Sequence, residues 1–193
     1  YPANFKQPLK EEYFLKGELE KTNEFYALAK IAGIKLCEAY RKQYGCDYIS
    51  VMPTNLYGPN DNFNSESSHV PAALLNRFHN AKVLKEKEVT IWGNGKVSRE
   101  FLHVDDFADA CIFLLKSFSD SKIVNIGTGK DITIKEFATL IKKVVGYEGR
   151  IIFDNSKPSG VKKKLLNISK IKRLGWKPKI DLLTGLKKYY EWY

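Results

Sequence analysis

The hydrophobic and polar positions of the chain follow two different periods. Apolar residues recur every three to four positions over residues 22–44, which predicts an amphipathic helix with Thr22 as its N-cap and Gly45 closing it. The run Tyr48–Pro53 is short, apolar and ended by proline, as in a buried strand. The Gly-, Pro-, Asn- and Ser-rich segment that follows is a loop at the carboxyl end of that strand, where open α/β sheets bind ligands.

The rest of the chain continues this alternation. We expect helices over about 70–81, over VDDFADACIFLLKSF, from Thr133 to about Val145, and twice near the end. We expect strands on either side of the Gly-Asn-Gly turn in VTIWGNGKVSREFLHV, and in IVNIGTG and IIFD. The order predicts an α/β fold. Because the first part holds only one long buried strand, we expect further strands of its sheet to lie upstream of this chain.

Composition narrows the class of protein. Hydrophobic residues make up 44% of the chain, enough for a core, and we expect no membrane span. The net charge of +10 comes mostly from 27 lysines against 5 arginines, which are scattered over every segment. This pattern indicates a solvated surface and not a nucleic-acid interface. Three cysteines without CxxC spacing favour neither a disulfide framework nor a metal site, and we expect a cytoplasmic setting.

Tyr26 and Lys30 form a candidate proton-transfer pair. They lie four residues apart in the first helix, so both side chains share one face. An ammonium group favours the phenolate form of a nearby tyrosine, which can then exchange a proton with a carbonyl or an alcohol oxygen. In a chain with 11 tyrosines and so many lysines, one such spacing is expected by chance, so the pair alone does not establish this chemistry.

The surroundings of the pair resemble a known superfamily, the extended short-chain dehydrogenases/reductases that act on nucleotide sugars. The segments that carry the resemblance are AKIAGIKL, PTNLYGP, WGNGKVSREFLHVDD and VNIGTG. Within that superfamily, YALAKIAGIKLCEAYRKQYG, SVMPTNLYGPNDNF and REFLHVDD are similar to the GDP-L-fucose synthase family. Its members use NADPH to epimerise C3 and C5 and to reduce C4 of GDP-4-keto-6-deoxy-D-mannose. The resemblance covers essentially the whole chain.

The resemblance implies a role for each matching residue. Tyr26 would donate the proton for C4 reduction, Lys30 would tune it and hold the nicotinamide ribose, and His69 would exchange protons during epimerisation and touch the cofactor. The remaining matches are cofactor contacts from Pro53, Asn55 and Leu56, and GDP-sugar contacts from Arg77, Trp92, Arg99 and Lys164. No metal is implied.

The resemblance also implies a domain organisation and an assembly. Residues 1–60, rejoined by segments near 99–128, would be the remainder of an NADP-binding Rossmann domain with a doubly wound parallel sheet. Residues 61–193 would be mainly a small α/β substrate-binding domain. The helix that carries Tyr26 would pack against its counterpart in a homodimer.

Two departures from the family pattern limit what this chain can do. Ser159 stands where the family loop has an aspartate. The glycine-rich phosphate turn, the catalytic serine and the epimerisation cysteine belong upstream of Tyr1, and the chain does not begin with methionine, so we expect an excerpt of a longer protein. We therefore expect the 193 residues alone neither to bind NADPH tightly nor to turn over.

Two further hypotheses stay open from the sequence. The protein is a different nucleotide-sugar epimerase or reductase of the same superfamily, or it is a non-catalytic remnant that binds sugar nucleotides or serves dimerisation. A carboxylate near the upstream serine would favour a dehydratase, whereas an upstream cysteine together with His69 would favour the epimerase-reductase.

Overall fold

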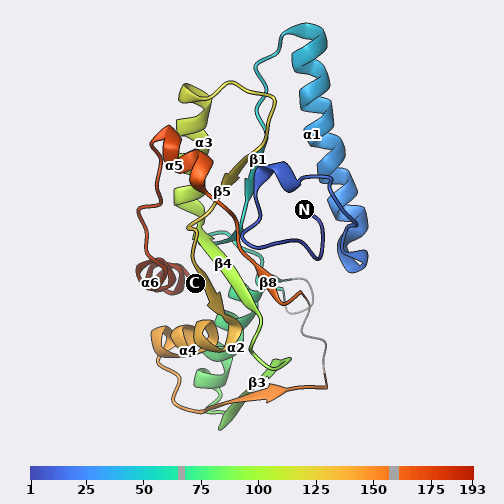
Figure 1. Cartoon of the computed structure of the whole chain (residues 1–193). Coiled ribbons are helices and arrows are strands. Elements are labelled where there is room, and N and C mark those ends of the chain that lie inside the picture. Colours follow the sequence, from blue (N-terminus) through green and yellow to red (C-terminus); the bar gives the residue numbers. More distant parts are fainter. Residues whose placement is uncertain (65–67, 157–160) are drawn as a thin grey trace.

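The computed structural model describes residues 1–64, 68–156 and 161–193, and builds them around three small sheets (Figure 1). The pairings are β1 with β5, β2 with β4 and β4 with β6, β8 along β4, and β3 with β7. All of these are parallel except β4 with β6. The strands are β1 Val51–Pro53, β2 Asn55–Tyr57, β3 Glu88–Trp92, β4 Ser98–His103, β5 Val124–Ile126, β6 Asp131–Thr133, β7 Arg150–Asp154 and β8 Lys163–Lys164.

Helices flank these sheets, and none of those in the described ranges is long and apolar enough to cross a membrane. The α-helices are α1 Glu24–Tyr44, α2 Val70–Val83, α3 Val104–Ser117, α4 Ile134–Val145, α5 Ser169–Leu174 and α6 Leu182–Trp192. Two 3₁₀ turns, η1 Glu11–Tyr13 and η2 Lys21–Asn23, precede α1.

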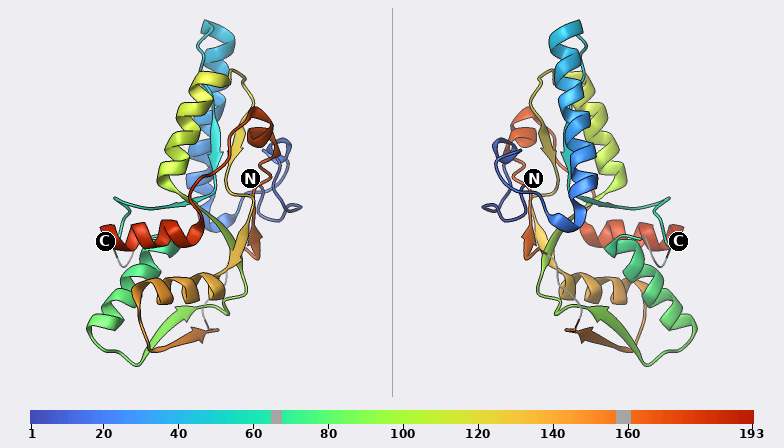
Figure 2. Two further views of the ribbon diagram at one scale, coloured as in Figure 1. Left: turned by 90° about the vertical axis from the view of Figure 1, so that its left-hand side faces the viewer. Right: turned by 90° about the vertical axis from the view of Figure 1, so that its right-hand side faces the viewer.

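One half of the molecule is a layered α/β unit. The β1·β5 pair lies between α1 and α3, and the right-hand view of Figure 2 shows α1 standing at the front of this half. Its buried side chains include Ala110 and Leu114 of α3 and Val124 and Ile126 of β5. Strand β5 is buried at all three positions, whereas β1 is only partly buried and its Pro53 is exposed, so the expectation of a buried strand over Tyr48–Pro53 is wrong. The predicted α/β class is confirmed.

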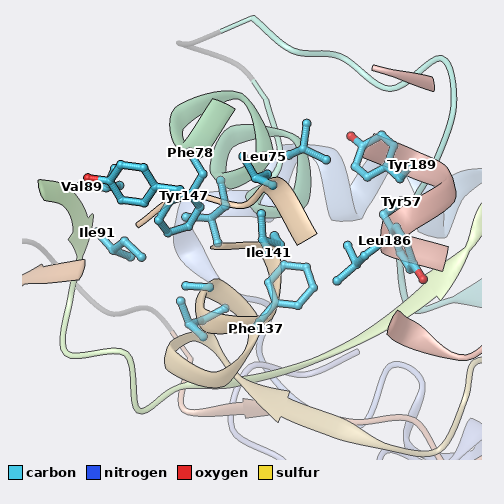
Figure 3. Close-up of a cluster of buried hydrophobic side chains, with 14 of the residues drawn as sticks. Tyr57, Leu75, Phe78, Val89, Ile91, Phe137, Ile141, Tyr147, Leu186 and Tyr189 are labelled. Atoms are coloured by element: carbon cyan, nitrogen blue, oxygen red, sulfur yellow. The ribbon is translucent and has the colours of Figure 1, made fainter. Parts of the chain in front are cut away.

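The other half packs α2, α4 and α6 together and against β3 (Figure 3). In α4, Ile134, Phe137, Ile141 and Val145 are buried at helical spacing, which is why this segment forms an amphipathic helix. The Phe137 ring stacks on Phe101 of β4 with their centroids 4.0 Å apart. Each such buried side chain contributes about 1.5–3 kcal/mol.

Strand β4 links the two halves. Successive side chains of a strand point to opposite faces, so Phe101 packs in the core with α4 while Leu102 packs in the core with α3. The division into residues 1–60 and 61–193 stays a prediction, as does the return of residues 99–128 to the first unit.

One further expectation about local structure is wrong and another is confirmed. Thr22 is not the N-cap of α1, because the helix begins at Glu24 and the Thr22 hydroxyl donates instead to Glu20. Strands β3 and β4 do form on either side of the Gly-Asn-Gly turn, but they do not pair with each other. Each strand has other partners: Gly93 continues the pairing of β3 by donating its N–H to the Asp154 carbonyl at the end of β7.

Candidate functional site

A cleft of about 520 Å³ lies beside α1 and gathers several of the predicted residues. Tyr26 and Lys30 line it from α1, Pro53 and Asn55 line it from β1 and β2, and Lys164 lines it from β8. One helical turn separates Tyr26 from Lys30, which is why both face the same cleft. The predicted proton-transfer pair therefore lines the same cleft as the end of β1.

The geometry of this cleft is set by a few contacts. The Lys30 ammonium lies 5.4 Å from the centroid of the Tyr26 ring, within the range of a cation–π contact. The Thr54 hydroxyl and the Asn55 amide both donate to the Glu100 carbonyl, at 3.0 and 2.8 Å. These bonds fix the short connection between β1 and β2 and therefore the positions of Pro53 and Asn55.

A second, smaller cleft of about 240 Å³ gathers three of the residues predicted to bind the GDP-sugar. Arg77 comes from α2, Trp92 from the end of β3 and Arg99 from β4. Arg77 donates to the Thr90 carbonyl at 2.6 Å, which holds its side chain along β3. Trp92 is 65% exposed, so its ring presents a flat apolar face to solvent and is not part of the core.

The two clefts meet at a pair of cations. Arg99 of the smaller cleft and Lys164 of the larger one are register partners on the neighbouring strands β4 and β8. Burial lowers the pKa of the Arg99 guanidinium, and the charge of Glu20 opposes that shift. An anion bound at this pair would touch both clefts.

The structure does not bring every predicted residue into these clefts. Leu56 packs partly buried against the core of the α1–α3 half. His69 is exposed, directly precedes α2 and lines neither cleft. The loop with Ser159 lies outside the described residues.

The other two histidines are structural. His103 is buried, and its Nδ1 accepts from the Asp105 N–H as the N-cap of α3. His79 is half-buried, and its Nδ1 lies 3.1 Å from the Tyr190 hydroxyl. Among the residues that the structure describes, no cluster of three or more His, Cys, Asp or Glu side chains is arranged to hold a metal.

Sequence reasoning missed Glu100, a fully buried carboxylate next to Arg99 in β4. Its buried carboxylate accepts from the backbone N–H groups of Thr128 and Gly129 at 2.6 Å and of Leu166 at 2.9 Å. Burial raises the pKa of this carboxyl, and those hydrogen bonds oppose the rise. Glu100 directly follows Arg99, and its bond to Leu166 holds the chain two residues beyond Lys164. Glu100 therefore helps to fix the backbone near both cations. The only signal in the sequence is a charged residue within the apolar run of REFLH.

Comparison with known proteins agrees with this architecture. The model of a family described as NAD dependent epimerase/dehydratase matches residues 1–127. A curated relative named "Probable GDP-L-fucose synthase 1", from Oryza sativa subsp. japonica, is 56% identical over 193 residues, which are 100% of this chain and 59% of the relative. The chain thus spans about three fifths of that relative's length.

Solved structures give the same picture. A GDP-6-OMe-4-keto-L-xylo-heptose reductase from C. jejuni is 40% identical with a TM-score of 0.95, over 100% of this chain and 67% of that one. A GDP-L-fucose synthetase from Naegleria fowleri, bound to NADP, is 28% identical with a TM-score of 0.95, over 100% of this chain and 62% of that one. The resemblance inferred from the motifs is confirmed.

Proposed function

Since the chain belongs to the NAD dependent epimerase/dehydratase family, we propose that its protein is an NADPH-dependent GDP-L-fucose synthase. It epimerises C3 and C5 of GDP-4-keto-6-deoxy-D-mannose and reduces C4. The observation that carries the proposal is the meeting of the Tyr26–Lys30 cleft with the Arg77–Trp92 cleft at Arg99 and Lys164. The 56% identity to the rice relative supports this choice of reaction.

A nucleotide sugar matches the two clefts part by part. Its sugar lies in the larger cleft next to Tyr26, and its guanosine lies in the smaller cleft against Trp92 and Arg77. Its diphosphate falls at Arg99 and Lys164, where charge-assisted hydrogen bonds to phosphate oxygens are strong.

The larger cleft also fits the nicotinamide end of NADPH. Its wall combines an ammonium from Lys30, an apolar surface from Pro53 and an amide from Asn55, which suit ribose hydroxyls and a flat ring. Leu56 packs behind this wall, and His69 is assigned to the cofactor by family resemblance alone. When bound, NADPH supplies the hydride for C4.

The chain's own residues handle the protons. Tyr26 gives its phenolic proton to the C4 oxygen as the ketone becomes an alcohol, and Lys30 stabilises the phenolate that remains. Before that step, a C–H proton next to the ketone, which is acidic enough to be removed, passes to one member of a pair formed by His69 and the epimerisation cysteine that the family resemblance implies. This leaves an enolate, and the other member of the pair returns a proton to the same carbon. Proton return on the opposite face inverts that carbon.

Replacing Tyr26 by phenylalanine in the whole protein tests whether Tyr26 serves the reduction and not the epimerisation. Tyr26→Phe removes only the proton donor, so reduction should fall by about 10²- to 10⁴-fold. Solvent deuterium should still enter C3 and C5, as followed by NMR. Tyr44→Phe, an exposed tyrosine on the same helix, is the matched control and should keep both activities. Equal loss of reduction and exchange in Tyr26→Phe would contradict the assignment.

A second candidate is a GDP-sugar C4 reductase that does not epimerise. Two observations favour it: His69 lines neither cleft, and the C. jejuni heptose reductase matches with a TM-score of 0.95. The same deuterium experiment separates the two functions. Reduction without exchange at C3 and C5 would identify the plain reductase.

We also propose that α1 pairs with its counterpart in a homodimer. Apart from the cleft-lining face with Tyr26 and Lys30, the helix carries a second apolar stripe. Phe25 is 85% exposed, Leu28 49% and Leu36 58%. A stripe of this kind on one helix suits a second copy of itself, because a two-fold axis places the same surface on both partners.

A further inference from the structure

A carboxylate already lies at the cation pair where the two clefts meet. Glu20 Oε2 is 3.2 Å from the Lys164 ammonium, and Glu20 Oε1 accepts from the Thr22 hydroxyl at 2.9 Å. Glu20 lines the same cleft as Tyr26 and Lys164. It comes from the segment that leads into α1, far in sequence from the strand that it contacts.

The other lysine of β8 offers an internal comparison. Because side chains alternate along a strand, Lys163 and Lys164 point to opposite faces. Lys163 pairs at 2.9 Å with Asp131, which belongs to β6 of the same sheet and also accepts from Ser98. That carboxylate is fixed by the sheet itself, whereas Glu20 is held at the junction by Lys164 and by its own neighbour Thr22.

We propose that Glu20 is an internal counter-ion, which the diphosphate of a sugar nucleotide must displace from Lys164 and Arg99. The inference rests on the proposed function for the identity of the anion. It makes Glu20 a determinant of affinity: the carboxylate keeps the two cations compensated in the free protein and repels an incoming anion.

The electrostatics of the site agree with this role. Hydrogen bonds from Thr22 and Lys164 lower the pKa of Glu20, so it carries its negative charge at neutral pH. Arg99 also interacts with that charge. Without Glu20, two positive charges would stand uncompensated at the junction.

Binding of anions to a Glu20→Gln variant of the whole protein tests the proposal. Inorganic pyrophosphate, GDP and guanosine are titrated by calorimetry at about 50 and 200 mM salt, and Glu18→Gln serves as the matched control. Glu18 is exposed and lies two residues away in the same segment. Glu20→Gln should bind GDP and pyrophosphate about 3- to 10-fold more tightly at low salt, with a steeper loss of affinity as salt rises. Guanosine binding should not change, and Glu18→Gln should match the unmodified protein.

The outcomes separate this inference from the function on which it rests. Unchanged or weaker binding of both anions by Glu20→Gln, while the unmodified protein binds GDP, would overturn the counter-ion role alone. Tighter pyrophosphate binding by Glu20→Gln, with no GDP binding by either protein, would support the counter-ion role and contradict the proposed nucleotide. If none of the three proteins binds GDP or pyrophosphate, both the counter-ion role and the proposed function are overturned.

Discussion

Gly127 shows how closely the backbone approaches the buried carboxylate of Glu100. A Cβ at this position would lie 2.3 Å from Glu100 Oε1 and 2.9 Å from its Cδ. Neither atom can withdraw freely, because three backbone N–H groups hold the carboxylate. Gly127→Ala should therefore lower the free energy of unfolding by about 1–3 kcal/mol, measured by urea denaturation.

Gly33 provides the control for this substitution. An added Cβ there meets no heavy atom within 4 Å, and the residue lies inside α1. Gly33→Ala should raise stability by about 0.5–1 kcal/mol, because alanine loses less backbone entropy in a helix. Similar losses in both variants would show that contact with Glu100 is not the cause.

At the scale of single residues, the sequence predicted those site residues that belong to local motifs. Tyr26 and Lys30 share a cleft because helical spacing alone places them together. Glu100 was not predicted, because its partners Thr128 and Leu166 come from segments that only the fold brings to it. The exposed position of His69 was equally invisible, since nothing in Ser-His-Val reports what packs against it.

The N-terminus of α4 carries a capping box that can be tested as a unit. The Thr133 hydroxyl accepts from the Glu136 N–H at 3.2 Å, and the Glu136 carboxylate accepts from the Thr133 N–H at 3.0 Å. Thr133→Ala should cost about 1 kcal/mol of unfolding free energy. Thr139→Ala in the same helix is the control and should be nearly neutral, because its hydroxyl bonds the Lys135 carbonyl inside the helix and caps neither end.

The contribution of this capping box also depends on pH. Hydrogen bonds from the side chain and backbone of Thr133 lower the pKa of Glu136 below its ordinary value of 4.5. A lowered carboxyl pKa stabilises the fold above the unfolded-state pKa, and that stability is lost as pH falls through the folded-state pKa. The stability difference between the unmodified protein and Thr133→Ala should thus narrow below about pH 4.5, as measured by thermal unfolding across pH. A constant difference would exclude the Glu136 carboxylate from the cap.

At the scale of elements, helices were predicted better than strand partners. The signals for α3 and α4 are local: apolar spacing, acidic first turns and the Thr133 cap. Gly45 likewise ends α1 in a left-handed conformation, with φ of 69°. The pairing of β3 with β7 and of β4 with β2 depends instead on distant segments, so the sequence predicted these strands but not their partners.

At the scale of the whole molecule, the positions of the two clefts explain why the sequence could give the residue types of the site but not its layout. Arg99 and Lys164 become neighbours only because β8 runs along β4. Arg77 and Trp92 reach the smaller cleft from α2 and β3, whose positions are fixed by the core shared with α4. The site is thus a product of packing between the halves that β4 links.

The proposed homodimer makes a prediction for the exposed stripe of α1. Leu36 is 58% exposed and lies outside the set of cleft-lining residues, so Leu36→Glu should leave the cleft intact. A two-fold interface contains Leu36 twice, and losing about 1 kcal/mol of apolar burial at each copy should weaken the dimer at least about 30-fold.

Sedimentation velocity over a range of protein concentrations measures this change. Val83→Glu places the same charge at a residue that is 63% exposed at the end of α2, and it should leave association unchanged. Unaltered association of Leu36→Glu would show that the apolar stripe of α1 is not the dimer interface. Dissociation of both variants would mean that added negative charge weakens the dimer wherever it is placed. Only a loss of association confined to Leu36→Glu assigns the dimer contact to α1.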